Sequence, residues 1–311
     1  MQACFKNPAK SFVICSALCL FASTAQAVDY DYLSLHVEGG LSTQATGINE
    51  AGAIVGSYQQ PQGKSVLLRP FVYKDGVYQT YTPAEPAVFT FDDINDAGHV
   101  VTNVTHRNMT EVASLVKGSK KITLAVPGAV TTYAYALDDS DRVAGAYNHD
   151  PNELGILTTS GYLWDASTGY TGFDAPGAAG LTVAWGLNSA QDTVGVYADA
   201  DYVYHGFVRH GDGSIVTLDY PGSPYTQLMG INDGGDIVGF YQDPVDYSMK
   251  GFLYRAGEFQ LITPPDAVYG SYPYRVTADG RIVGWYINGD GLVRSFLATP
   301  KASPAKSAKR G

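Results

Sequence analysis

A passage made of a polar turn and a strand-forming run recurs six times along this 311-residue chain. The strand-forming runs read AIVGSY, HVVTNV, RVAGAY, TVGVY, DIVGFY and RIVGWY, at 53–58, 99–104, 142–147, 193–197, 236–241 and 281–286. The turns open with Asn49, Asn95, Asp138, Asn188, Asn232 and Thr277, at intervals of 46, 43, 50, 44 and 45 residues. So regular a period restricts the chain to folds that repeat one supersecondary unit.

Each repeat contains four short strand patterns. In the fifth copy they span 227–231, 236–241, 250–255 and 258–263, and they are rich in Val, Ile, Tyr and Phe. Gly, Asn and Asp punctuate them, and no stretch after residue 27 keeps a helical period over three turns. Four strands in a unit of this length are typical of a β-propeller blade.

The two ends of the repeat region predict how the ring closes. The last copy stops after its third strand, RSFLATP at 294–300, whereas YDYLSLHVEGG at 30–40 resembles a fourth strand. We therefore expect an all-β fold over 28–300, a six-bladed β-propeller of four-stranded blades whose last blade is closed by the N-terminal strand.

Two features of the passage predict local structure. Asn and Gly at the turn indicate a side-chain cap and a positive-φ position in a tight hairpin. A glycine within the second strand indicates a close approach between neighbouring blades. These glycines are Gly56, Gly145, Gly195, Gly239 and Gly284.

The motifs GINDGGDIVGFY (230–241), HGFV (205–208), KGFLY (250–254) and LDYPG (218–222) resemble the extracellular HAF-type repeat family of bacteria. This resemblance covers almost all of the chain after residue 27 and implies a secreted bacterial repeat protein. It carries over neither a catalytic motif nor an established ligand. The second copy departs most, with Thr102, Val104 and Ser114 at positions that other copies give to Gly, Tyr and an aromatic residue.

The N-terminus has the layout of a secretory signal peptide. Lys6 and Lys10 precede the apolar run 12–21, and small residues end at Ala27, so we expect residues 1–27 to be removed on export to the periplasm or the cell exterior. The apolar run is too short for a permanent membrane span. All three cysteines lie within this segment, which excludes disulfide scaffolds and thiol chemistry from the remaining chain.

Charge restricts the partners. Without Lys6 and Lys10 the chain carries 18 basic and 30 acidic residues, so nucleic acid and anionic membranes would be repelled. The exception is the segment 301–311, KASPAKSAKRG, which we interpret as a disordered basic tail because it cannot bury a core. We expect a monomer that neither binds nucleic acid nor inserts into membranes.

Chemical motifs are scarce. The sequence contains no GxSxG and no HExxH, so no catalytic residue, cofactor or metal site is predicted. His106, His149 and His205 could meet between blades, and the acidic turns at Asp138 and Asp236 faintly resemble calcium loops. Isolated histidines and a solvated acidic rim explain these residues without an ion.

Departures from the repeat consensus on the first strand suggest a binding site. Just before the hydrophobic anchor, small residues give way to Asp93 and Arg275, and one position earlier stand Asp92, Tyr135, Trp185 and Tyr274. These six residues are the candidate ligand-binding set at the channel mouth, with core filling between blades as the alternative interpretation. Neighbouring strand residues point to opposite faces, so both sets can line the channel only if a bulge intervenes.

The sequence favours a non-catalytic module that binds a carbohydrate or protein ligand at the cell exterior. The alternative is a propeller hydrolase or lyase acting on a polysaccharide or lactone, and the third possibility is a structural matrix protein.

Overall fold

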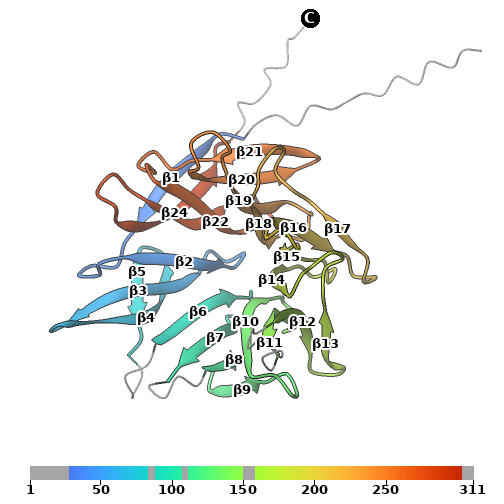
Figure 1. The fold of residues 1–311 in the computed structure, drawn as a ribbon. Coiled ribbons are helices and arrows are strands. Elements are labelled where there is room, and N and C mark those ends of the chain that lie inside the picture. The colour runs from blue at the N-terminus through green and yellow to red at the C-terminus, as the bar shows by residue number, and fades with distance from the viewer. Residues whose placement is uncertain (1–27, 83–87, 107–110, 150–157, 303–311) are drawn as a thin grey trace, which may run out of the picture.

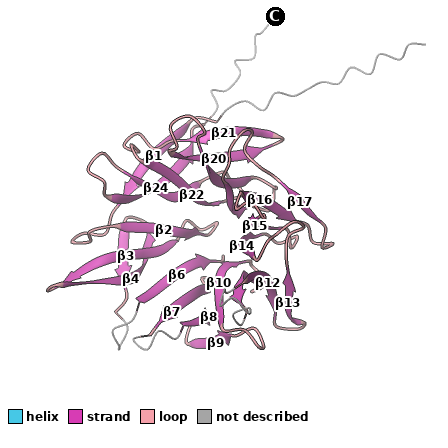
Figure 2. Ribbon diagram, viewed as in Figure 1, coloured by secondary structure: helices cyan, strands magenta, loops and turns pink. Residues whose placement is uncertain are grey.

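The computed structural model describes residues 28–82, 88–106, 111–149 and 158–302. These residues form 24 β-strands and no helix, so the predicted all-β class is confirmed (Figures 1 and 2). The predicted signal peptide and most of the predicted tail, at 1–27 and 303–311, lie outside the described residues.

The strands group into six antiparallel units of four. The first three units comprise β2 (Thr43–Ile48), β3 (Ile54–Gln62), β4 (Ser65–Lys74) and β5 (Val77–Thr80); β6 (Val88–Ile94), β7 (Val100–Thr105), β8 (Glu111–Lys117) and β9 (Lys120–Leu124); and β10 (Thr131–Leu137), β11 (Val143–Asn148), β12 (Thr159–Asp165) and β13 (Gly169–Phe173). The last three comprise β14 (Leu181–Leu187), β15 (Thr193–Ala198), β16 (Tyr204–Arg209) and β17 (Ile215–Thr217); β18 (Thr226–Ile231), β19 (Ile237–Gln242), β20 (Met249–Arg255) and β21 (Glu258–Ile262); and β22 (Gly270–Val276), β23 (Ile282–Ile287), β24 (Val293–Pro300) and β1 (Tyr30–Leu35).

Two pairs of units merge into eight-stranded sheets. The third and fourth units are joined by one parallel pairing, Thr159 with Leu181, and the fifth and sixth by Met249 with Gly270. Each link joins the third strand of one unit to the first strand of the next. The four-stranded antiparallel unit therefore remains the element that repeats.

Both ends of the described chain meet in the sixth unit. Strand β1 pairs antiparallel with β24, from Tyr30 opposite Pro300 to Leu35 opposite Ser295. The units are arranged around a centre (Figure 1), where the first strand of each contacts the first strand of the next, and β22 contacts β2.

The apolar core lies mostly between neighbouring units. One cluster joins Val194 of the fourth unit to Leu228 and Phe252 of the fifth, and another joins Val283 of the sixth to Ile54 and other residues of the first. A fully buried aromatic ring from the third strand recurs in five units, and burial of each phenylalanine among them contributes about 1.5–3 kcal/mol. These rings belong to Phe71, Tyr162, Phe207, Phe252 and Phe296, and Ser114 takes the place in the second unit.

The repeated turn caps itself. In the first unit Asn49 Oδ1 accepts the backbone N–H of Ala53, and Gly52 has a φ of 77°. The same cap occurs in the other five units, from Asn95, Asp138, Asn188, Asn232 and Thr277. The predicted side-chain caps and positive-φ positions are therefore present in every copy, with Asp141 and Gln191 adopting the positive φ in two of them.

The prediction for the second-strand glycines was wrong about their neighbour. A Cβ at Gly56 would overlap the carbonyl oxygen of Gln44, and one at Gly145 would overlap that of Tyr133. Gly195, Gly239 and Gly284 face the equivalent carbonyls. The crowding thus comes from the first strand of the same unit and not from the adjacent unit.

Candidate functional site

Every first strand carries a β-bulge at the candidate position. In all six units the pairing with the second strand skips one residue, for example between Phe91 and Asp93. The skipped residues are Thr46, Asp92, Tyr135, Trp185, Met229 and Tyr274. A bulge breaks the two-residue alternation of side chains, so neighbouring residues can both face the centre. The bulge that the sequence analysis required for both sets of candidate residues to line the channel is therefore present in every unit.

The next residue along each first strand lies where the strands approach most closely. A Cβ at Gly186 would stand 2.9 Å from the Cα of Gly230, and one at Gly47 would stand 2.9 Å from the Cα of Asp93. Small residues are therefore needed at most of these positions. The exceptions are Asp93 and Arg275.

Asp93 and Arg275 bond to each other across the centre. The Arg275 Nε donates to Asp93 Oδ2 at 3.0 Å, while its Nη atoms donate to the backbone carbonyls of Met229, Tyr274 and Tyr135 at 2.8, 2.9 and 2.6 Å. Asp93 also accepts the backbone N–H of Leu137. This central pair links the second, third, fifth and sixth units.

The central pair is buried, with Asp93 and Arg275 exposing 5% and 8% of their surface. Burial raises the pKa of Asp93 although the guanidinium and two backbone N–H groups oppose the shift. The structure thus brings these two candidate residues together as partners of each other, with their polar groups occupied by the protein.

The candidate aromatic residues are partly exposed and divide into two groups. The ring centres of Tyr135 and Trp185 lie 4.2 Å apart, and Tyr133 lies parallel to Tyr135 at 5.9 Å. Tyr274 lies instead 6.4 Å from Trp285. The Nε1 of Trp185 is buried without a hydrogen-bond partner among the described residues.

Sequence reasoning missed Tyr133, Tyr272 and Trp285. Tyr272 stacks on Trp285 at 3.8 Å, extending the second aromatic group. Tyr133 and Tyr272 each stand two residues before a candidate tyrosine, and this spacing was the signal that could have identified them.

Asp92 lies near the aromatic groups and holds a perturbed carboxyl. Its Oδ2 accepts hydrogen bonds from Thr90 Oγ1 at 2.7 Å and Asn103 Nδ2 at 3.0 Å. Burial raises the pKa of Asp92 to about 6, against the opposing effects of these two bonds and Arg275. Burial raises the pKa of Tyr135, and the negative charge of Asp92 adds to this shift. The carboxyl can therefore change protonation near neutral pH.

A cavity of about 250 Å³ opens beside the central pair, lined by the ends of the first strands and by the capped turns. Asn49 Nδ2 donates to Asn95 O at 3.0 Å, and Asn95, Asn188 and Asn232 repeat this link to the following unit. Each asparagine thus caps its own turn and binds its neighbour.

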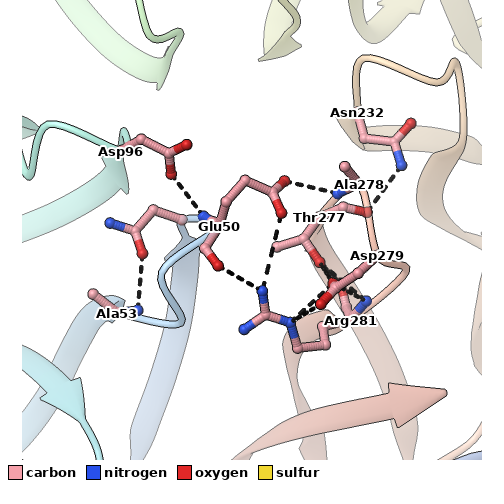
Figure 3. A network of polar contacts seen from close by, with 9 residues as sticks. Glu50, Ala53, Asp96, Asn232, Thr277, Ala278, Asp279 and Arg281 are labelled. Carbon is pink, nitrogen blue, oxygen red and sulfur yellow. Dashed lines mark hydrogen bonds and ion pairs between the residues drawn. The ribbon is translucent and has the colours of Figure 1, made fainter. Parts of the chain in front are cut away.

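Arginines replace the inter-unit link where the anchor is not asparagine. Arg142 Nη2 donates to Ser189 O at 2.6 Å, and Arg281 Nη2 donates to Glu50 O at 2.8 Å. Figure 3 shows the second case, in which Glu50 Oε1 also accepts the backbone N–H of Ala278 at 2.7 Å. The sixth unit is thereby bonded to the first.

Within the described part of the chain, no group of three His, Cys, Asp or Glu side chains is placed to share a metal ion. His149 contacts Ser160, while His205 contacts Asp219 and Asp199. The acidic turns are also engaged internally, since Asp138 pairs with Arg142 and Asp236 with Arg255. In the residues that the structure describes, no helix is long and apolar enough to cross a membrane.

Repeated four-stranded units around a bonded centre define the chain as an all-β protein of propeller type. No family model matches the sequence, and no curated protein matches it. The fold does match solved structures.

A variant of the Aleuria aurantia lectin, in complex with Fucα1-6GlcNAc, aligns with a TM-score of 0.52 and 11% identity over 86% of this chain and 99% of the lectin. The SapL1 lectin, in complex with α-methyl fucoside, aligns with a TM-score of 0.53 and 14% identity over 85% and 97%. TolB from Acinetobacter baumannii aligns with a TM-score of 0.50 and 12% identity over 80% and 64%. The Aleuria aurantia lectin is described as a six-bladed β-propeller.

Proposed function

We propose that this chain is a secreted, closed six-bladed β-propeller that binds a carbohydrate at the cell exterior, without catalysis. The pairing of β1 with β24, the contact between β22 and β2, and the bonds from Arg281 and Ala278 to Glu50 support a closed ring. Six four-stranded units support the blade count.

The observation that carries the binding function is the set of partly exposed aromatic rings around Asp92. Tyr135 and Trp185 are partly exposed rings of the kind against which a sugar ring stacks, and the buried indole N–H of Trp185 has no acceptor among the described residues. Asp92 can accept or donate a hydrogen bond to a hydroxyl, depending on its protonation. A few polar groups among aromatic faces are the usual composition of a small-ligand site.

The comparisons favour carbohydrate over protein as the ligand class. Two structures that share the fold are lectins whose complexes contain fucosides. Because these alignments show similarity of fold, the sugar that this chain binds has to be identified by the binding experiment.

The test is a glycan array probed with residues 28–302, followed by titration of the best ligand against Trp185→Ala and Asp92→Asn. We expect each variant to weaken binding about tenfold or more, through loss of stacking or of a charged hydrogen bond, while remaining folded. Tyr202→Ala, which removes an 83% exposed ring in the β15–β16 loop, is the control and leaves affinity unchanged. We call the proposed site at Tyr135, Trp185 and Asp92 the channel site. Unchanged ligand affinity in Trp185→Ala and Asp92→Asn contradicts it.

One observation favours the hydrolase or lyase alternative. A carboxyl with a pKa of about 6 is suited to general acid catalysis near neutral pH. Its neighbour Asp93 is held by Arg275, so the second carboxylate of a glycosidase pair would have to come from elsewhere. Turnover of a polysaccharide that is lost in Asp92→Asn would establish the enzyme instead of the binding module.

Export and the HAF-type resemblance belong to this proposal, as does a monomeric state. Fractionation of expressing cells tests export, with cleavage after Ala27 visible by mass spectrometry. Light scattering of the purified protein tests the monomer.

A further inference from the structure

A tyrosine and a basic side chain face each other across the second and third strands of four units. The register pairs Tyr58 with Arg69, Tyr197 with His205, Tyr241 with Lys250 and Tyr286 with Arg294. The recurrence at one register position defines a base position in the repeat, and it allows the surroundings of the base to be compared between units.

In the fourth and fifth units carboxylates neutralise this base. His205 Nδ1 lies 2.7 Å from Asp219 Oδ2, and its Nε2 lies 3.3 Å from Asp199 Oδ2. Lys250 Nζ lies 2.6 Å from Asp243 Oδ2 and 3.2 Å from Asp246 Oδ2. In both units the basic side chain is therefore already paired with carboxylates of the protein itself.

In the sixth unit neutral groups hold the two positions that Asp199 and Asp219 occupy in the fourth unit. Asn288 stands two residues after Tyr286, where Asp199 and Asp243 follow their tyrosines. His36 stands at the position that corresponds to Asp219. Leu35 pairs with Ser295, the residue after Arg294, just as Leu218 bonds to Gly206, the residue after His205. Burial and the nearby Arg294 lower the pKa of His36, which favours the neutral form of the imidazole.

Arg294 is consequently without a carboxylate partner among the described residues. Its Nη1 donates to the carbonyls of Leu41 and Val293 at 3.0 Å, which fixes the guanidinium in place. No partner within the described chain engages its Nε and Nη2.

Arg294 lines a cavity of about 450 Å³, within the range of roughly 300–1,000 Å³ of small-ligand pockets. The wall combines donors and acceptors from β1, from the β21–β22 connection and from the β23–β24 hairpin. The polar side chains are those of Ser34, His36, Asp266, Tyr286, Asn288, Asp290 and Arg294, and the hydroxyls of Ser34 and Tyr286 lie 3.2 Å apart. The exposed carboxylates of Asp266 and Asp290 would repel an anion, so this mixture fits an uncharged ligand with several hydroxyl groups.

We infer that this pocket in the sixth unit is a second binding site, which takes a neutral saccharide unit through hydrogen bonds from Arg294 and to the nearby carboxylates. The sugar class rests on the proposed function, whereas the site rests on Arg294 and the cavity. The fourth and fifth units cannot offer the same site because carboxylates already neutralise their base, and in the first unit Arg69 is buried.

Two-dimensional NMR of the ¹⁵N-labelled protein separates this pocket from the channel, because Gly289 lines the pocket and the Trp185 indole N–H lies in the channel site. The probes are the methyl glycosides of fucose, glucose, galactose and mannose, with methyl glucuronide as the charged comparison. We expect at least one neutral glycoside to shift the Gly289 amide at millimolar concentration and the glucuronide to bind more weakly.

Asn288→Asp restores the carboxylate that Asp243 supplies in the fifth unit and should occupy Arg294 internally, weakening this binding about tenfold. Arg294→Gln should weaken it similarly, and Lys250→Gln, at the equivalent paired base, is the control. Arg294→Gln also removes the bond to Leu41. If Arg294→Gln fails to fold, the binding result for Asn288→Asp decides the question.

The site is refuted if no neutral glycoside shifts Gly289, if the glucuronide binds more tightly, or if Asn288→Asp binds normally. A shift of the Trp185 indole alone refutes the pocket and leaves the channel proposal standing, whereas a shift of Gly289 alone supports the pocket and contradicts the channel site.

Discussion

Replacing Arg275 with Met should destabilise the protein by about 3–5 kcal/mol, the usual cost of leaving a buried charge without its partner. Methionine keeps most of the side-chain length and cannot donate. The change removes the bond to Asp93 and the bonds to three carbonyls, on Met229, Tyr274 and Tyr135. The strand ends of four units would lose their common partner.

The double variant Asp93→Asn/Arg275→Met separates the charge from the packing. It removes the uncompensated carboxylate, so we expect it to recover about 2 kcal/mol relative to Arg275→Met alone. The pH dependence gives a second measure. Losing Arg275 should raise the pKa of Asp93 further, and because protonation then favours the folded state, the defect of Arg275→Met should shrink as pH falls from 7 to 5.

Urea unfolding followed by circular dichroism, at pH 5 and pH 7, measures all three proteins. A loss below about 1 kcal/mol in Arg275→Met would show that water reaches and solvates Asp93. A double variant no more stable than the single one would show that the carbonyl bonds, and not the charge, dominate.

Three further predictions concern Asp92, the N-terminal strand and the junction of the first and sixth units. Because the folded protein holds the Asp92 proton up to a pKa of about 6, stability should fall as pH rises from about 4 to 6, and Asp92→Asn should flatten this dependence in urea titrations; an equal pH slope in both proteins would contradict the raised pKa. Deletion of residues 28–40 should abolish soluble folding, because β24 loses its partner strand, and an unchanged melting temperature would refute this pairing. Arg281→Ala should cost about 1–3 kcal/mol through its lost bond to Glu50, and the matched Arg142→Ala should cost a similar amount, as chemical denaturation can show.

The strand pattern was predictable because it is local and repeated. In the fifth unit the expected second strand, 236–241, overlaps β19 at Ile237–Gln242, and the caps from Asn49 and its counterparts follow from the turn sequence alone. The neighbour of Gly56 was not predictable, because a repeat pattern shows that a small residue is needed without showing which strand approaches it. The crowding carbonyl belongs to the first strand of the same unit.

Contacts across the centre were less predictable. The sequence places Asp93 and Arg275 at the same position of the repeat, where both depart from the small residues of the other copies. The bond between them, however, depends on how far apart the first strands stand. Arg142 and Arg281 did carry a readable signal, since each follows by four residues a turn anchor that lacks an amide to donate.

The pairing of β1 with β24 also sets the order in which the molecule can assemble. Strand β1 finds its partner only when β24, at the other end of the described chain, has been synthesised. Until then both ends present unpaired backbone groups to other chains, which makes the nascent protein prone to association. The slow step of folding should therefore be the meeting of the two ends, and relocating β1 to follow β24 in a circularly permuted gene should remove the delay.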